Sequence, residues 1–342
     1  MLDTNWVRTL ARSMAIGAGA IAMLTAAGSA AAQDAFAIGH VPGDVTSIGA
    51  KFAEVAGTFA KYNIKPELVR IDAGSRGVQV LLSGKLQAMQ VGFSVAVNAN
   101  REGADLRMVS SSCNVMPMEI FVVPTVKSAA DLKGQKIAVS SFASESDMAV
   151  SLALRHWNMT RKDVVVTQLG GMSQRLAAQL SGQVPASPYV APGTALAREK
   201  GLVSLVDLAA EGEPWVFNGL IVNRDFVKSK PDVLKRFLKA YIEGVYKALS
   251  DEKWAKEVIS KEWKTDSKTV LDETYKLFKK VYPRDFTPSN AAIANVIAEV
   301  NSIGPPLATK NPEDYVDLGP LDALKKEGFF DEMKKRYPTA LK

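Results

Sequence analysis

The sequence predicts an α/β protein in which two lobes each contain a mostly parallel β-sheet flanked by helices. Short apolar runs alternate with helix-like segments from residue 35 onward, and this alternation is typical of parallel strands covered by helices. The pattern restarts near residue 119, and the final third changes to long helices. With 47% hydrophobic and 23% charged residues, the 342-residue chain can form a core in each lobe.

The first set of elements is expected to build one lobe. Its apolar runs predict strands, and the segments after them have the 3.6-residue periodicity of helices. The strands are expected at 35–39, 67–71, 86–92 and 106–110. The intervening helices are expected at 48–60, 75–83 and 93–101.

A second set with the same alternation predicts the other lobe. Strands are expected at 119–123, 136–140, 164–169, 186–190 and 203–208. Helical segments are expected at 129–134, 144–157, 172–181 and 193–200. The apolar run 217–223 can then carry the chain back to the first lobe. These crossings predict one lobe from residues 33–123 and 219–342, and a second from residues 124–218.

The last third predicts long helices that complete the first lobe. Apolar residues between 233 and 249 recur at helical spacing, which indicates a core-facing stripe. Ser229 and Asp232 have the S-x-x-D spacing of a helix start. Further helices are expected at 268–281, 289–303 and 321–336.

The first 32 residues predict a secretory signal peptide. Arg8 and Arg12 precede the apolar segment 14–27, and small residues follow up to Ala32. This order predicts cleavage after Ala32 and export to the periplasm, with a retained N-terminal anchor as the alternative. The G-x-G-x-x-A match that starts at Gly17 lies inside this leader with no strand before it, so it does not indicate a dinucleotide site.

Cysteine content, charge and motifs limit the classes of function. The one cysteine, Cys113, excludes an internal disulfide, and the two histidines lie apart from it, without metal-ligand spacing. Loss of the leader lowers the formal net charge of +6 by one. The basic residues of the final third alternate with acids, so no nucleic-acid partner is expected. Because the mature chain contains no G-x-S-x-G, P-loop or H-E-x-x-H motif, we expect no enzyme activity, cofactor or metal.

Four stretches of the chain resemble a known family. They are AGSRGVQVLLSGKLQAMQVGF, DLKGQKIAVSSFASESD, LAAQLSGQVPASPYVAPGTALAREKG and FNGLIVNRDFVKSKPDVLKRFLKAY. They are similar to the periplasmic solute-binding proteins of ABC importers, in the nitrate/sulfonate/taurine (NitT/TauT) group, and the resemblance covers nearly all of the mature chain. One departure is Pro185, where many members carry an acidic residue, and its expected effect is on local packing.

The resemblance implies a type II periplasmic-binding architecture with the ligand in a cleft between two lobes. It further implies hinge closure around a small organic solute, which is a sulfonate or taurine, a related small anion, or a heterocycle. The implied partners are this small-molecule ligand and the permease subunits of an ABC importer in the inner membrane, with the binding protein monomeric.

Turns that follow the predicted strands indicate where the ligand binds. Open α/β sheets bind ligands beyond the carboxyl ends of their strands, and helix N-termini there present unpaired N–H groups. Glycines permit close approach, serines supply hydroxyls, Arg76 can pair with an acidic group, and aromatic rings can wall the cavity. The candidate ligand-binding residues are His40, Pro42, Gly43, Gly74, Ser75, Arg76, Phe93, Ser94, Phe142, Ser144, Glu145, Ser146, Ser187, Tyr189 and Asn218.

Other interpretations remain open at this point. Each serine is also explained as a plain helix N-cap, and Arg76 as a solvent-facing side chain. An enzyme of the thiamine-pyrimidine-synthase type is one alternative on the same fold, although those fungal enzymes carry a cysteine-rich motif and this chain has Cys113 alone. A ligand-loaded sensory module is the other alternative.

Overall fold

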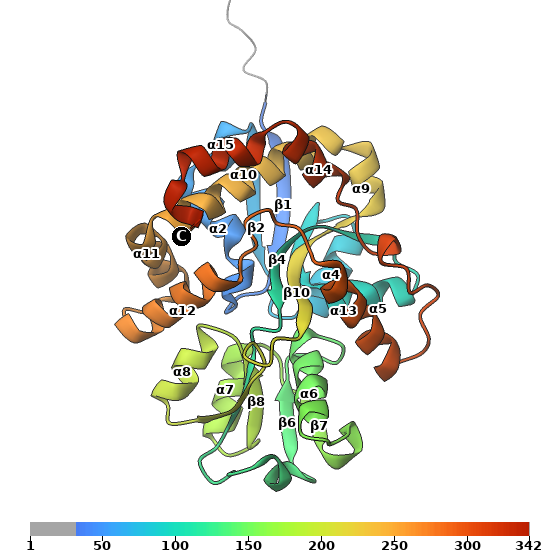
Figure 1. The fold of residues 1–342 in the computed structure, drawn as a ribbon, viewed down its shortest axis with the longest axis vertical. Coiled ribbons are helices and arrows are strands. Elements are labelled where there is room, and N and C mark those ends of the chain that lie inside the picture. The colour runs from blue at the N-terminus through green and yellow to red at the C-terminus, as the bar shows by residue number, and fades with distance from the viewer. Residues whose placement is uncertain (1–31, 342) are drawn as a thin grey trace, which may run out of the picture. The chain divides into compact units, whose positions relative to one another are not determined.

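The computed structural model describes residues 32–341, which contain two five-stranded sheets (Figure 1). The predicted leader, apart from Ala32, lies outside the described residues. The first sheet has the strand order β2-β1-β3-β10-β4, and we call the part built on it the first lobe. Its strands are β1 (Asp34–His40), β2 (Ile64–Arg70), β3 (Ala88–Gly92), β4 (Leu106–Val115) and β10 (Pro214–Asn223).

The second sheet, on which the second lobe is built, has the strand order β7-β6-β8-β5-β9. Its strands are β5 (Glu119–Val122), β6 (Lys136–Val139), β7 (Val165–Gln168), β8 (Ala186–Tyr189) and β9 (Val203–Asp207). In each sheet one strand runs against the others: β10 is antiparallel to β3 and β4, and β5 is antiparallel to β8 and β9. Both strands directly follow a crossing between the sheets. The predicted α/β fold with mostly parallel sheets is confirmed.

Helices cover both sides of the first sheet. Figure 1 shows α2 (Gly49–Ala56) and α10 (Pro231–Ser250) on one side. The other side carries α4 (Gly74–Leu82), α5 (Phe93–Arg101) and α13 (Asn290–Ile303). The apolar stripe predicted for α10 is buried, and its Phe237 stacks on Phe36 of β1 with 3.9 Å between ring centroids. These side chains belong to one continuous apolar cluster.

The second sheet also buries both faces, because successive residues of a strand point to opposite sides. Ile137 and Val139 of β6 pack with Val150 of α6 (Glu145–His156). Ala138, between them, packs with Ala178 of α7 (Met172–Leu180). The helix α8 (Gly193–Glu199) adds to a further small cluster with Phe121 of β5.

The remaining helices differ from the sequence predictions in several places. The helix predicted at 48–60 is divided into α2 and α3 at Gly57, whose φ of 72° lies in the left-handed region. Ser229 ends α9 instead of starting α10: its Oγ donates to the Asp225 carbonyl at 2.6 Å, so the predicted S-x-x-D start is wrong. The predicted last helix is divided at Gly328, whose φ of 74° lies in the left-handed region. A helix that was not predicted, α11 (Glu252–Trp263), precedes α12 (Lys268–Val281). The helices are α3 (Thr58–Lys61), α9 (Arg224–Ser229), α11 (Glu252–Trp263), α12 (Lys268–Val281), α14 (Gly319–Lys326) and α15 (Phe329–Arg336).

Strand pairing locates the two crossings. β5 belongs to the second sheet and β10 to the first, so the connecting stretches are residues 116–118 and 208–213. The lobe boundaries predicted at 123/124 and 218/219 each lie a few residues after the crossing seen in the strand pairing. Within residues 32–341, no helix has both the length and the apolar character needed to cross a bilayer.

Candidate functional site

A cavity lies beyond the carboxyl ends of strands from both sheets. It encloses about 630 Å³, including space open to solvent. Its wall follows the ends of β1, β2 and β3 in the first lobe and of β6, β7 and β8 in the second, as expected for open α/β sheets. The wall residues are Val41, Pro42, Gly43, Asp44, Asp72, Gly74, Val91, Gly92, Val95, Met118, Ser140, Ser144, Glu145, Ser146, Gly171, Met172, Arg175, Val190, Phe217 and Asn218.

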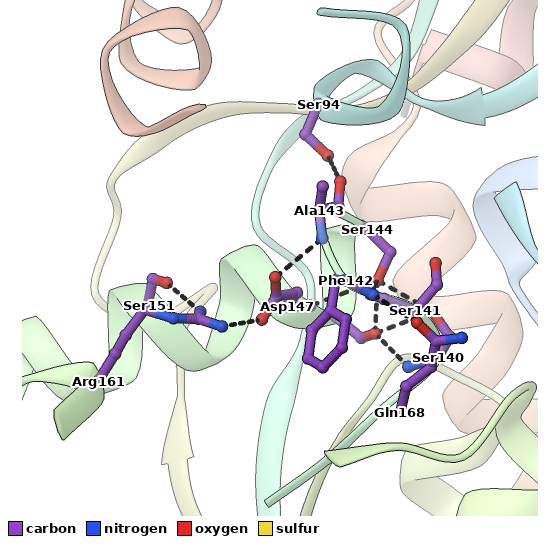
Figure 2. A network of polar contacts seen from close by, with 11 residues as sticks. Ser94, Ser140, Ser141, Phe142, Ala143, Ser144, Asp147, Ser151, Arg161 and Gln168 are labelled. Carbon is purple, nitrogen blue, oxygen red and sulfur yellow. Dashed lines mark hydrogen bonds and ion pairs between the residues drawn. The ribbon is translucent and has the colours of Figure 1, made fainter. Parts of the chain in front are cut away.

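A network of serine hydroxyls fixes the part of the wall that precedes α6 (Figure 2). Ser144 is the N-cap of this helix. The Ser140 hydroxyl lies 3.0 Å from those of both Ser144 and Ser146, and its backbone N–H donates to Ser146 Oγ at 2.8 Å. The N–H of Ala143, which has a left-handed φ of 60°, donates to Asp147 Oδ2 at 2.8 Å. These bonds hold the turn against the cavity.

Glu145, the first residue of α6, joins the second lobe to the first. Its Oε1 accepts the Ser94 backbone N–H at 2.9 Å, and its Oε2 accepts Nε1 of Trp215 at 2.7 Å. The side chain is buried, with 7% of the residue exposed. Burial raises the pKa of Glu145 to about 7, opposed by the hydrogen bonds from Ser94 and Trp215.

Gly92 makes this contact between the lobes possible. A Cβ atom at position 92 would lie 2.2 Å from Cγ of Glu145. A real Cβ does not approach a side-chain carbon so closely, so any larger residue would displace the carboxylate. The glycine is therefore required for close approach, not for an unusual backbone conformation, since its φ is −56°.

A second carboxylate, Asp44, faces the cavity from the first lobe. Its Oδ1 accepts the backbone N–H and the hydroxyl of Thr46, both at 2.8 Å. Its Oδ2 accepts Nδ2 of Asn218 at 3.1 Å, and the same Nδ2 lies 3.0 Å from Thr46 Oγ1. Burial raises the pKa of Asp44 to about 6, although these hydrogen bonds favour the charged form.

Arg175 of α7 places a guanidinium in the wall of the second lobe. Its Nη1 donates to Ser187 Oγ at 3.0 Å and to the Pro188 carbonyl, while Nε donates to the Gly170 carbonyl at 3.2 Å. Only 5% of the residue is exposed. Burial lowers the pKa of Arg175 to about 10, so it stays positively charged at neutral pH. Among residues 32–341, no acidic side chain forms a salt bridge with it.

The structure brings seven of the predicted ligand-binding residues together in this wall. They come from four segments, namely the β1–α2 turn, the start of α4, the start of α6 and β10. The seven are Pro42, Gly43, Gly74, Ser144, Glu145, Ser146 and Asn218. Their contact with a ligand stays a prediction.

Three predicted residues lie outside the cavity on solvent-facing positions. Ser75 and Phe142 line a separate apolar groove, where Phe142 is 57% exposed. Arg76 is exposed on α4, which agrees with the solvent-facing interpretation of that side chain. Ser75 does not cap α4, because the N-cap is Ala73. Its hydroxyl lies 3.5 Å from that of Ser141, across the lobes.

Five further predicted residues are buried around the cavity without lining it. His40 lies beside it in a smaller pocket, where burial lowers its pKa to about 4. Phe93 is a core side chain. Ser94 contacts Glu145 through its backbone N–H. It does not cap α5, because the N-cap of that helix is Gly92. Ser187 and Tyr189 pack behind Arg175: the Ser187 hydroxyl accepts from the guanidinium, and the Tyr189 ring lies 5.2 Å from it.

Sequence reasoning missed the charged wall residues Asp44, Asp72 and Arg175. Asp44 directly follows the predicted Pro42 and Gly43, so a fuller analysis of that turn would have found it. Arg175 had no comparable signal, because its burial depends on contacts with Ser187 and Pro188 of the strand β8.

Cys113 is fully buried, and burial raises the pKa of its thiol well above the usual range. Within residues 32–341, no group of three or more His, Cys, Asp and Glu side chains is placed to hold a metal ion.

Comparison with known proteins identifies relatives. The sequence model of the family described as "NMT1/THI5 like" matches residues 46–255. The taurine-binding periplasmic protein of Escherichia coli K12 is 28% identical over 200 residues, which cover 57% of this chain and 61% of the relative. The riboflavin-binding protein RibY of Chloroflexus aurantiacus is 28% identical over 172 residues, which cover 49% and 48%. The chain thus matches less than two thirds of the length of either relative.

Solved structures establish the fold. The alkanesulfonate-binding protein SsuA from Xanthomonas axonopodis pv. citri, solved bound to MOPS, superposes with a TM-score of 0.69 at 18% identity. The superposition covers 82% of this chain and 96% of that protein. The family resemblance predicted from the four sequence stretches is confirmed by these matches. The family model matches more than half of the residues of this chain, and the chain therefore belongs to the NMT1/THI5-like family.

Proposed function

We propose that this protein is the extracytoplasmic solute-binding component of an ABC importer and captures a small organic solute in the cavity described above. The observation that carries the proposal is that one cavity takes its wall from both lobes. The names of the relatives, which bind taurine, riboflavin and alkanesulfonates, support the class of activity. The implied site of action is the periplasm, and the implied partner is the permease.

Contacts across the lobes supply a mechanism of hinge closure. Glu145 bridges the lobes at the cavity, and two ion pairs flank it: Arg155 with Glu299 at 2.8 Å, and Arg198 with Glu273 at 3.0 Å. A ligand shifts the open–closed equilibrium only through contacts that differ between the two states. A solute held by both walls makes such contacts, so it favours closure around the connecting stretches 116–118 and 208–213.

The arrangement favours binding over catalysis. Raised carboxylate pKa values often mark catalytic sites, but those of Asp44 and Glu145 are caused by burial, and both groups are fixed by hydrogen bonds within the wall. The buried thiol of Cys113 is unsuited to iron or nucleophilic chemistry. We therefore propose a non-enzymatic binding protein, and the family resemblance leads us to propose that it is monomeric.

A thermal-shift screen of the purified mature protein tests this function. The panel contains taurine, alkanesulfonates, MOPS, nitrate, small carboxylates and riboflavin, since a ligand that binds only the folded state raises the Tm. We expect a saturable rise for at least one class. Met172→Trp, which fills the cavity, should weaken that binding at least tenfold, whereas the matched control Arg76→Trp on the exposed face of α4 should not.

Uptake in cells separates transport from other uses of binding. Deletion of the gene should abolish uptake of the radiolabelled solute that raises the Tm, and the plasmid-borne gene should restore it. Unchanged uptake after deletion would contradict the transport role. Equal effects of Met172→Trp and Arg76→Trp would contradict the location of the site.

A further inference from the structure

We propose that closure of the two lobes in the solute-free protein takes up a proton at Glu145, so that acidic pH favours the closed form. This inference rests on the hinge closure of the proposed function and adds a dependence on pH to it. It follows from the position of a carboxylate that belongs to one lobe and is covered by the other.

The burial of Glu145 is a property of the closed form. The residue begins α6 of the second lobe, yet both of its hydrogen-bond donors belong to the first lobe. Ser94 of α5 donates its backbone N–H at 2.9 Å, and Trp215 of β10 donates Nε1 at 2.7 Å. The backbone of Gly92 packs against the same side chain. Opening about the stretches 116–118 and 208–213 therefore separates the carboxylate from these groups and lets water reach it.

In the closed form this buried carboxylate has no cation beside it. In residues 32–341, no Lys, Arg or His side chain forms a salt bridge with Glu145, and both of its donors are neutral. Removal of an unpaired carboxylate from water is costly, so such a group binds a proton more readily. Burial accordingly raises the pKa of Glu145 to about 7 in the closed form. Contact with water in the open form returns this pKa towards its ordinary value of 4.5.

The groups on the cavity side and in the second sheet leave this proton affinity in place. The negative charge of Asp44, in the first-lobe wall, raises the pKa of Glu145 further. Cys113 of β4 stays a neutral thiol, because burial raises its pKa well above the usual range. Arg175 donates to neutral oxygens and stays charged throughout this pH range. Glu119 of β5 is paired with Arg198.

The charged groups of the helices around Glu145 are engaged with other partners. Asp147 of α6 pairs with Arg161 at 2.7 Å. Arg101, the one charged residue of α5, bonds to oxygens of α5 and α13. Glu299 of α13 pairs with Arg155 of α6 across the lobes; burial raises the pKa of Glu299, and the ion pair opposes that rise. Glu145 is thus the interface acid that lacks a cationic partner.

His40 does not share this dependence on closure. Burial lowers its pKa to about 4, but the pocket that buries it is lined by first-lobe residues alone. Lobe opening therefore leaves His40 in the same surroundings, and its titration does not shift the balance between the open and closed forms.

The direction of the pH effect follows from the two pKa values of Glu145. The closed form binds the proton more tightly than the open form, so closure becomes more favourable as the pH falls from about 7 towards 4.5. Between pH 8 and pH 5 we expect the ratio of closed to open protein to rise by about tenfold or more. Above pH 7 the charged carboxylate favours opening, which exposes the cavity to solute.

X-ray scattering of the solute-free mature protein at pH 5 and pH 8 tests the proposal. The radius of gyration should be smaller at pH 5. In Glu145→Gln, which has no proton to take up in this range, it should be the same at both pH values. Glu299→Gln at the same interface and Glu313→Gln outside the cavity should keep the pH dependence. A wild-type radius that is unchanged, or larger at pH 5, would overturn the inference. If a solute still raises the Tm in that case, the proposed function stands.

Infrared difference spectra identify the group that takes up the proton. The C=O band of a protonated carboxyl should be stronger at pH 5 than at pH 8, and the part that Glu145→Gln removes belongs to Glu145. Its midpoint should lie above the ordinary 4.5 and no higher than about 7. A midpoint at the ordinary value would overturn the inference.

A variant of the donor provides a second test if Glu145→Gln does not fold. Trp215→Phe removes the Nε1–H group, whose hydrogen bond favours the charged form of Glu145. The midpoint of the scattering transition should therefore move to higher pH, whereas the control Trp254→Phe should leave it in place. An unshifted midpoint in Trp215→Phe would contradict the role of Glu145.

Discussion

The two lobes hold their halves of the cavity by different means. In the first lobe the sheet and its helices share one continuous apolar cluster, in which Phe36, Phe59 and Phe237 pack together. In the second lobe Ile120, Met148, Leu152 and Val206 join that cluster, and the other buried apolar side chains divide into smaller clusters. Serine hydroxyls and Arg175 fix its part of the wall. The comparison indicates that the first lobe has the larger apolar core, while the cavity wall of the second lobe depends more on polar contacts.

The largest expected effect concerns the apolar support of the first lobe. Phe237→Ala removes a fully buried ring that stacks on Phe36, and such truncations cost about 3–5 kcal/mol. Urea unfolding should show this loss. The control Phe142→Ala removes an exposed ring, and a change within about 0.5 kcal/mol is expected. A loss below about 1 kcal/mol for Phe237→Ala would contradict the assigned role of this core.

The second effect is a dependence of stability on pH. The folded protein holds the pKa of Glu145 at about 7 and that of Asp44 at about 6, against ordinary values of 4.5 and 3.8. The folded state therefore binds protons more tightly than the unfolded state, so these groups make stability fall as pH rises from about 4 to about 7. For Glu145 the loss is at most about 3 kcal/mol.

Unfolding free energies measured at pH 5 and pH 8 check this dependence. The ligand-free protein should be more stable at pH 5, although the lowered pKa of His40, about 4, partly offsets this because it makes stability fall below about pH 6.5. Glu145→Gln should reduce the difference. The control Glu313→Gln changes an acid outside the cavity and should leave the difference unchanged. Greater stability at pH 8 would show that other titrating groups dominate.

A smaller effect is expected for the polar connection between the lobes. In Glu145→Gln one carboxylate oxygen is replaced by an NH₂ group, which is a donor. The side chain can then no longer accept the hydrogen bonds from Ser94 N–H and Trp215 Nε1 with both of its terminal atoms. Loss of one buried hydrogen bond costs about 1–3 kcal/mol. The cost should favour lobe opening, detected as a larger radius of gyration in X-ray scattering and a red shift of tryptophan emission. An unchanged scattering curve would contradict the bridging role of Glu145.

The smallest effect is expected for the outer ion pair of Arg155 and Glu299. Arg155 is half-exposed and also pairs with Glu213, whereas the Glu299 side chain is only 10% exposed. Because the arginine keeps contact with solvent and shares its charge between two acids, we expect the pair to contribute about 0–1 kcal/mol. A double-mutant cycle with Arg155→Ala and Glu299→Ala should give a coupling energy in that range. A coupling above about 2 kcal/mol would show that surface charges, and not the cavity contacts, hold the lobes together.

Local pattern was enough to predict the fold and part of the site. The helix expected at 93–101 agrees with α5, because Gly92 and the apolar spacing are local signals. The two-lobed order followed from the restarted alternation. Contacts between distant segments were not predictable: Trp215 reaches Glu145, and Arg175 is buried by Ser187 and Pro188. Ser75 and Arg76 were placed in the site because they follow a strand, but the first turn of α4 directs them outward.

At position 92 the need for glycine comes from the contact with Glu145 across the lobes, and not from the folding of either lobe. The backbone of Gly92 has a conformation that any amino acid adopts, so each lobe can form with alanine there. The added methyl group would nevertheless occupy the space of the Glu145 side chain. Gly92→Ala therefore offers a way to prepare a folded protein in which that docked arrangement is disfavoured.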